Sequence, residues 1–181
     1  MAILKIYTAP DPVLKRVASP VDKVDDALRR QMDDMLETMY DDDGIGLAAP
    51  QVGISNRVLV IDLEQKDGKG LDKKGNPLYF VNPEIVWFSE ECSIYNEGCL
   101  SVPEMYAEVE RPAQIRVKYL DYNGKAQELE ADGLLATCLQ HEVDHLNGIL
   151  FIDHLSALKR NIILRKLKKL TKLSEAEAVP V

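Results

Sequence analysis

The 181-residue chain contains only three cysteines, three histidines and one tryptophan, and no apolar run approaches the roughly 20 residues of a membrane span. The N-terminal stretch MAILKIYTAPDP lacks a basic segment followed by a long apolar one, which argues against a secretory signal peptide. Without such a signal, a small and odd number of cysteines indicates reduced thiols in place of a disulfide framework. We therefore expect a cytoplasmic protein with no membrane segment.

Basic residues are also in deficit, with 22 Lys and Arg against 30 Asp and Glu and a formal net charge of −8. A general nucleic-acid binder would need a basic surface, so this composition predicts no specific nucleic-acid binding. The deficit is uneven, because residues 155–181 carry seven Lys and Arg and only two Glu. No repeat or linker divides the chain, so we expect one catalytic domain over residues 1–181 with a basic C-terminal helix and tail.

Hydrophobic periodicity divides the chain into helices and strands that do not alternate as βαβ units. We predict helices over 25–40, 132–147 and 156–172, and strands over 57–63, over 78–88 with a break at Pro83, and over 115–131 with a hairpin turn at Asn123-Gly124. Asp132 is expected to cap the second helix and Gly148 to end it. The charged, glycine-rich stretch 64–76 is expected to be a solvated loop. Segregated helices and antiparallel strands indicate an α+β fold.

The sequence QHEVDHLNG, residues 140–148, contains two of the three histidines. His141 and His145 are four residues apart, so on a helix they share one face and can converge on one ion. Glu142 lies beside them, and the H-E-x-x-H pattern is typical of a metal site whose glutamate acts as a general base. The alternative is a helix with an exposed polar face.

A third protein ligand must come from elsewhere in the chain. The pattern H-E-x-x-H-x-x-G-x-x-H fails here because position 151 is Phe. The downstream options are His154, Asp153, Glu175 and Glu177. Upstream, Cys99 in EGCLSVP (97–103) is a better candidate, because we expect a bend there that presents its sulfur.

Two other cysteines are weaker ligand candidates. Cys138 lies on the same helix face as His141 but about 10 Å from His145 along the axis. Cys92 lies in an ordinary strand pattern. We expect both to be buried by packing, as free cysteines usually are.

Three blocks of the sequence, in this order, closely resemble the signature blocks of bacterial peptide deformylases: GIGLAAPQVG (44–53), EGCLSVP (97–103) and QHEVDHLNG (140–148). The stretch DPVLKRVASPV near the start is similar as well, so the resemblance covers about the whole chain. It implies antiparallel sheets packed around a central metal-binding helix. It also implies a substrate, the N-formylmethionyl end of a newly made polypeptide, from which formate is released.

The resemblance implies that Cys99, His141 and His145 bind the metal. It implies that Glu142 is the acid/base residue. The Gln51 side chain and the Leu100 backbone N–H are the implied oxyanion donors. Three protein ligands leave one position open, as in a catalytic site. A site of two histidines and one cysteine suits Zn²⁺ by ligand type, and Fe²⁺, Ni²⁺ or Co²⁺ also fit. The resemblance favours Fe²⁺.

The methionine side chain of such a substrate needs an apolar pocket. Ile45, Leu134 and Cys138 are the candidate walls, and Gly46 would let the substrate backbone approach closely. We also expect Glu97 to bind substrate. It could instead pair with Arg111 and brace the Cys99 loop.

Asp144, between the two histidines, could support the metal ligands or be merely exposed.

Two other functions use some of the same residues. One is a metallopeptidase with Asp or Glu as third ligand. The other is a closed structural metal site with a fourth protein ligand such as Cys138 or His154.

The basic segment 156–172 has no acidic residue. Its apolar side could lie on the core, and comprises Leu158, Ile162, Ile163, Leu167 and Leu170. Alternatively, the segment could contact the phosphate-rich surface of a ribosome, where nascent chains are made.

Overall fold

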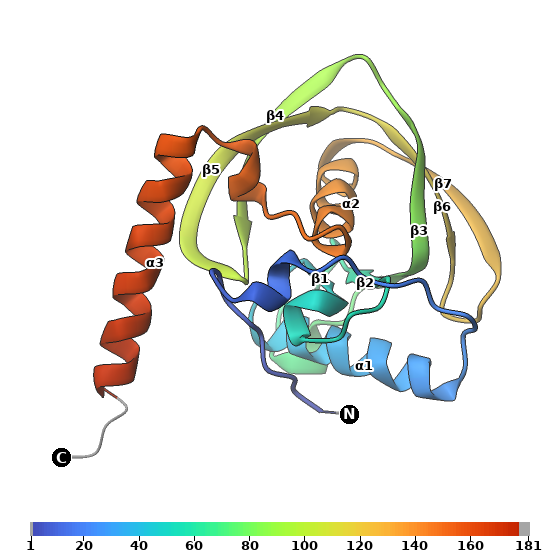
Figure 1. Cartoon of the computed structure of the whole chain (residues 1–181). Helices are drawn as coiled ribbons and strands as arrows, with labels where there is room; N and C mark the ends of the chain where they lie inside the picture. The colour runs from blue at the N-terminus through green and yellow to red at the C-terminus, as the bar shows by residue number, and fades with distance from the viewer. Residues whose placement is uncertain (1, 178–181) are drawn as a thin grey trace.

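Helices and antiparallel strands make up most of residues 2–177, the part of the chain that the computed structural model describes (Figure 1). The helices are α1 (Asp26–Asp41), α2 (Gly133–Leu146) and α3 (Ala157–Glu177). The strands are β1 (Gly46–Ala48), β2 (Val58–Ile61), β3 (Leu78–Phe88), β4 (Cys92–Cys99), β5 (Val102–Pro112), β6 (Ile115–Leu120) and β7 (Ala126–Ala131). Short 3₁₀ helices lie at Pro12–Lys15 (η1), Ala49–Val52 (η2), Gly70–Lys73 (η3) and Phe151–His154 (η4).

The strands form two antiparallel sheets. The larger has the order β1-β2-β3-β6-β7, and the smaller is the β4-β5 hairpin. Figure 1 shows α2 in the centre, surrounded by strands, with α3 beside β5 at the edge of the body. The predicted α+β class, with a central motif-bearing helix and a C-terminal helix, is confirmed. No helix within residues 2–177 is long and apolar enough to cross a membrane.

The first two helices begin and end close to the predicted residues. Asp25 caps α1, because its carboxylate accepts the Leu28 N–H at 2.9 Å. Asp132 occupies the N-cap position of α2, but its side chain makes no capping hydrogen bond, so that part of the prediction is wrong. Gly148 follows α2 at a φ of +73°, and an added Cβ there would lie 2.4 Å from the Lys15 carbonyl oxygen. Glycine is therefore required by both backbone conformation and space.

Helix α3 is longer than predicted, and strand β3 spans the predicted residues without the predicted break. Helix α3 continues to Glu177, because Ser-Glu-Ala-Glu contains no helix breaker. Strand β3 continues through Pro83, where a break was predicted. Pro83 lies in a β-bulge, where the register with β6 shifts between Val81 and Glu84. The amide side chain of Asn82 fixes this irregularity by exchanging two 2.8 Å hydrogen bonds with the backbone of Val21.

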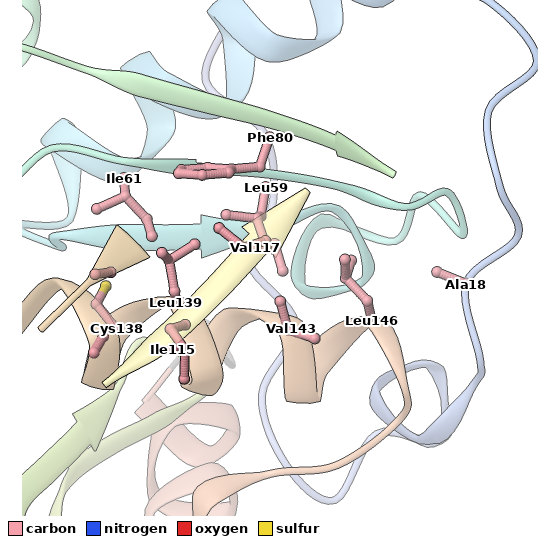
Figure 2. Packing of buried hydrophobic residues seen from close by; sticks show 13 residues of the cluster. Ala18, Leu59, Ile61, Phe80, Ile115, Val117, Cys138, Leu139, Val143 and Leu146 are labelled. Atoms are coloured by element: carbon pink, nitrogen blue, oxygen red, sulfur yellow. The ribbon is translucent and has the colours of Figure 1, made fainter. Parts of the chain in front are cut away.

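A hydrophobic cluster fixes α2 against the larger sheet. Figure 2 shows Leu139, Val143 and Leu146 of α2 packed with side chains from β2, β3 and β6, among them Leu59, Ile61, Phe80, Ile115 and Val117. Fully burying a side chain of this size contributes about 1.5–3 kcal/mol. Packing along the whole length of α2 therefore gives its two histidines a fixed position relative to the strands.

Candidate metal centre

Three side chains from two distant parts of the chain converge beside α2. The Sγ of Cys99 and one ring nitrogen each from His141 and His145 all lie within 4.8 Å of one another. The Cys99 Sγ is 3.3 Å from His145 Nε2. Cys99 ends β4, and the two histidines lie on adjacent turns of α2. The structure thus brings together the three residues predicted as ligands.

The His141 ring is oriented by a buried carboxylate. Its Nδ1 lies 2.9 Å from Glu97 Oε1, so Nδ1–H donates to the carboxylate and the lone pair of Nε2 is left for a metal. Glu97 in turn accepts two hydrogen bonds from Arg111, from Nε at 2.7 Å and from Nη2 at 2.9 Å. The predicted Glu97–Arg111 pair is therefore present, and both carboxylate oxygens of Glu97 are used within the protein.

This ion-pair network extends away from the metal ligands to the surface. The third guanidinium nitrogen of Arg111 donates to Asp144 Oδ2 at 2.9 Å, and His154 Nε2 lies 2.8 Å from the same oxygen. Burial alone would raise the pKa of Glu97, but hydrogen bonds from His141 and Arg111 outweigh it and hold that pKa below its usual value. Arg111 and Glu97 are only 5% and 3% exposed. A charged bridge thus connects β4, β5 and α2 behind His141.

The donor atoms fit a metal site. The His145 nitrogen that faces the other donors is Nε2, 3.3 Å from Cys99 Sγ. Burial lowers the pKa of His145 well below its usual value, which leaves a neutral ring, as metal coordination requires. No fourth His, Cys, Asp or Glu among the described residues joins the group of three. The set therefore corresponds to an open site more closely than to a closed structural one.

Glu142 lies next to the three converging atoms without belonging to their group. Its side chain is buried, and Oε2 has no hydrogen-bond partner in the described part of the chain. Burial raises the pKa of Glu142 to about 7, which suits a group that gives and takes protons near neutral pH. A Cβ added to Gly46 would lie 2.7 Å from Glu142 Oε1. Only glycine therefore leaves this carboxylate in place.

Gln51 is held so that its amide nitrogen faces Cys99. Its Oε1 accepts the Ala48 N–H at 2.9 Å, which fixes which end of the amide points inward. Nε2 then donates to Ser101 Oγ at 3.1 Å and approaches Cys99 Sγ at 3.5 Å. The side chain of Gln51 is buried. The predicted oxyanion donor thus lies beside the candidate metal ligand.

A cavity of about 290 Å³ opens onto Cys99, His141 and Glu142, and neither Gln51 nor His145 is among its lining residues. It is lined by every residue predicted to bind substrate, namely Ile45, Gly46, Glu97, Leu134 and Cys138, and also by Cys99, Leu100, His141 and Glu142. Two tyrosines in its wall were missed, Tyr95 of β4 and Tyr106 of β5. Both are exposed aromatic residues close in sequence to the EGCLSVP block, and this proximity could have identified them.

The two remaining cysteines differ from each other. Cys138 of α2 is buried in the core cluster between this helix and the larger sheet, as expected, and also contributes to the cavity wall. Cys92 is exposed at the start of β4, so the burial predicted for it is wrong. Because β4 belongs to a two-stranded hairpin, Cys92 at its start is left exposed.

The chain is similar to known proteins over most of its length. The family model for polypeptide deformylase matches residues 3–161. The chain is 58% identical over 172 residues to a peptide deformylase of Mesorhizobium japonicum, covering 95% of each chain, and 55% identical over 179 residues to that of Rhizobium meliloti, covering 99% and 100%.

Among solved structures, a peptide deformylase from Legionella pneumophila superposes with a TM-score of 0.87 at 46% identity, covering 99% of this chain and 100% of that one. A peptide deformylase from Ehrlichia chaffeensis in complex with actinonin gives 0.85 at 44% identity, covering 93% and 98%.

Proposed function

This chain belongs to the polypeptide deformylase family, and from that premise we propose how its own residues remove the formyl group from the N-terminus of a polypeptide. The reaction is the hydrolysis of a linear amide, in which water is consumed and formate and a free amine are released. The observation that carries the assignment to particular residues is the convergence of Cys99, His141 and His145 beside the buried carboxylate of Glu142.

Cys99, His141 and His145 would hold one divalent metal ion, in keeping with the metal dependence of the family. When bound, such an ion supplies Lewis-acid polarisation of a carbonyl and activation of water at neutral pH. Glu142 takes a proton from the attacking water onto its carboxylate. It then returns that proton to the departing amine nitrogen, which the release of a free N-terminus requires.

The developing negative charge on the formyl oxygen is stabilised by hydrogen-bond donors of this chain. The Gln51 amide carries two N–H groups, and one of them is engaged by Ser101. The other lies on the Cys99 side, where, together with the Leu100 backbone N–H, it would donate to the oxyanion. Loss of one such donor typically costs about 3–4 kcal/mol of transition-state stabilisation.

The methionine side chain of the substrate would occupy the cavity wall formed by Ile45, Leu134 and Cys138. Gly46 would let the substrate backbone approach. For Glu97 we now propose a positioning role instead of direct substrate binding, because Arg111 and His141 use both of its oxygens.

Formate release from formyl-Met-Ala by the metal-loaded protein tests the assignment directly. We expect turnover that is abolished by chelation and restored by a divalent metal. Absence of formate release from fully loaded protein would refute the proposed function. A Cys99→Ala variant that retains metal and cleaves internal peptide bonds would instead support the metallopeptidase alternative.

For the metal itself we propose Fe²⁺, with Zn²⁺, Ni²⁺ and Co²⁺ as ions the same ligands accept. If Cys99, His141 and His145 hold Fe²⁺, the site would be sensitive to oxidation of the metal or of the Cys99 sulfur. We expect peroxide to inactivate iron-loaded protein faster than nickel-loaded protein. Parallel time courses of formate release check this, and equal decay rates for both forms would contradict it.

We further propose that the substrate is met at the ribosome in the cytoplasm, because formylated N-termini belong to chains being made. Helix α3 offers a surface for this contact. Only Leu167 of α3 is fully buried, with Ile163 and Leu164 partly buried beside it, whereas Leu158 and Ile162 from the predicted apolar side are exposed. The helix thus presents basic and apolar side chains together to solvent.

Charge reversal of α3 tests the ribosome contact without disturbing Leu167. We expect Lys168→Glu, Lys169→Glu and Lys172→Glu together to reduce co-sedimentation with ribosomes at low salt, because phosphate contacts depend on charge. Hydrolysis of a short formyl peptide should be unchanged. Lys23→Glu, Lys118→Glu and Lys125→Glu, three exposed lysines elsewhere, provide the matched control. Equal co-sedimentation of both triple variants would leave α3 with a structural role only.

A further inference from the structure

The charged stretch 64–76, expected to be a solvated loop, is tied to the wall of the catalytic cavity. The Gln65 amide Nε2 donates to the Gly44 carbonyl at 2.8 Å and to the Asp62 carbonyl at 3.0 Å. The Asp62 N–H donates to the Ile45 carbonyl at 3.0 Å. The carbonyls of Gly44 and Ile45 in the cavity wall are therefore held by Gln65 of the loop and by Asp62 just before it.

The two ends of the loop are drawn together by Asp62, which is fully buried. Its carboxylate accepts hydrogen bonds from four donors: Tyr40 Oη at 2.5 Å and the backbone N–H groups of Glu64, Gly75 and Asn76 at 2.9, 2.9 and 3.2 Å. A Cβ added to Gly75 would lie 1.7 Å from the Glu64 carbonyl oxygen, so the chain can cross itself here only with glycine. The loop is thus a closed, anchored unit.

A second tether comes from the far side of the loop. Lys73 of η3 donates from Nζ to the Tyr40 carbonyl at 3.1 Å and forms an ion pair with Asp43. Asp43 follows α1 at a φ of +57° and lines the cavity. The segment from Asp43 to Ile45, which leaves α1 and enters β1, is consequently held by the loop through both Lys73 and Gln65.

We propose that Gln65 and Lys73 are positioning residues that set the methionine-binding wall of the cavity by fixing Gly44 and Ile45. The inference rests on the proposed function and extends it to residues outside the cavity. Ile45 is 42% exposed and lies at the cavity rim, so side-chain packing alone does not immobilise it. Its backbone tethers determine where its side chain meets an apolar substrate group.

Kinetics with two substrates separate this role from general stabilisation of the fold. We expect Gln65→Leu to raise KM for formyl-Met-Ala-Ser roughly threefold to tenfold, the effect of one hydrogen bond, and to leave kcat nearly unchanged. KM for formyl-Gly-Ala-Ser should stay as in the unaltered protein, because glycine has no side chain to contact Ile45. Lys73→Met should give the same pattern.

The matched control is Gln127→Leu, which removes an exposed amide that donates to Asp121 at 2.9 Å in the β6–β7 hairpin. It should leave both substrates unaffected. Equal KM changes for the two substrates in Gln65→Leu, or no change for either, would overturn the proposal.

Amide hydrogen exchange gives a readout that does not depend on the reaction. In Gln65→Leu, exchange should become faster at Asp62, whose N–H donates to the Ile45 carbonyl, and stay constant in the middle of α1. Unchanged exchange at Asp62 would overturn the positioning role. If the unaltered protein released no formate, the proposed function would fail, and exchange would still decide whether the loop fixes the wall.

Discussion

Replacing Glu142 with glutamine is expected to lower kcat/KM for formyl-Met-Ala by roughly a hundredfold or more while the protein keeps its metal. Glutamine preserves the size of the side chain and much of its hydrogen bonding, but it cannot accept the proton from water. Glu142 does not belong to the group of Cys99, His141 and His145, so the ligand set stays intact. Activity and metal content should therefore separate in this variant.

The measurement is formate release alongside metal analysis of the same preparation. Glu108→Gln, the same change at an exposed residue of β5, is the control and should be fully active. Near-normal turnover of Glu142→Gln with a full metal load would remove Glu142 from the acid/base role. A loss of metal in parallel with activity would show that the residue supports the ion instead.

Replacing Arg111 with methionine should lower the free energy of unfolding by about 3–5 kcal/mol, the usual cost of leaving one partner of a buried ion pair uncompensated. Methionine keeps much of the volume, but Glu97 would remain buried with only His141 as a partner, and Asp144 would lose its guanidinium contact. Urea denaturation at neutral pH measures the loss.

Arg116→Met serves as the control, because Arg116 forms its ion pairs with Glu128 and Glu130 on the surface, where such pairs contribute little. The double variant Arg111→Met with Glu97→Gln should regain part of the lost stability, since the uncompensated charge is gone. If Arg111→Met were as stable as the unaltered protein, the buried network could not be what holds β4 and β5 against α2.

Local spacing was sufficient to predict part of the site. The four-residue separation of His141 and His145 places both on one face of a helix, and helical periodicity is a short-range property of the sequence. Cys99 is different, because its approach to α2 results from the packing of a hairpin 42 residues upstream of His141. Residue patterns favoured Cys99 but left other third ligands open, and the three-block resemblance singled it out.

The wrong predictions share a physical cause, since each depended on tertiary contacts. Pro83 reads as a strand breaker, yet hydrogen bonds between Asn82 and Val21, far away in sequence, allow a bulge. Cys92 reads as a buried residue, but whether a strand is covered depends on which element packs over it. The loop 64–76 is largely exposed, as predicted, but its charged pattern did not indicate that the buried carboxylate of Asp62, just before it, anchors both of its ends.

The order of the larger sheet leaves β7 at one edge. An edge strand exposes unpaired backbone groups that can recruit a strand from another molecule and start aggregation. Here β7 carries Glu128 and Glu130, both exposed, and its residues 126–128 are exposed without interruption. A second copy approaching this edge would bring like charges together. Charged side chains on an edge strand disfavour such pairing, so we expect this edge to resist association through the sheet, a property separate from the chemistry of the cavity.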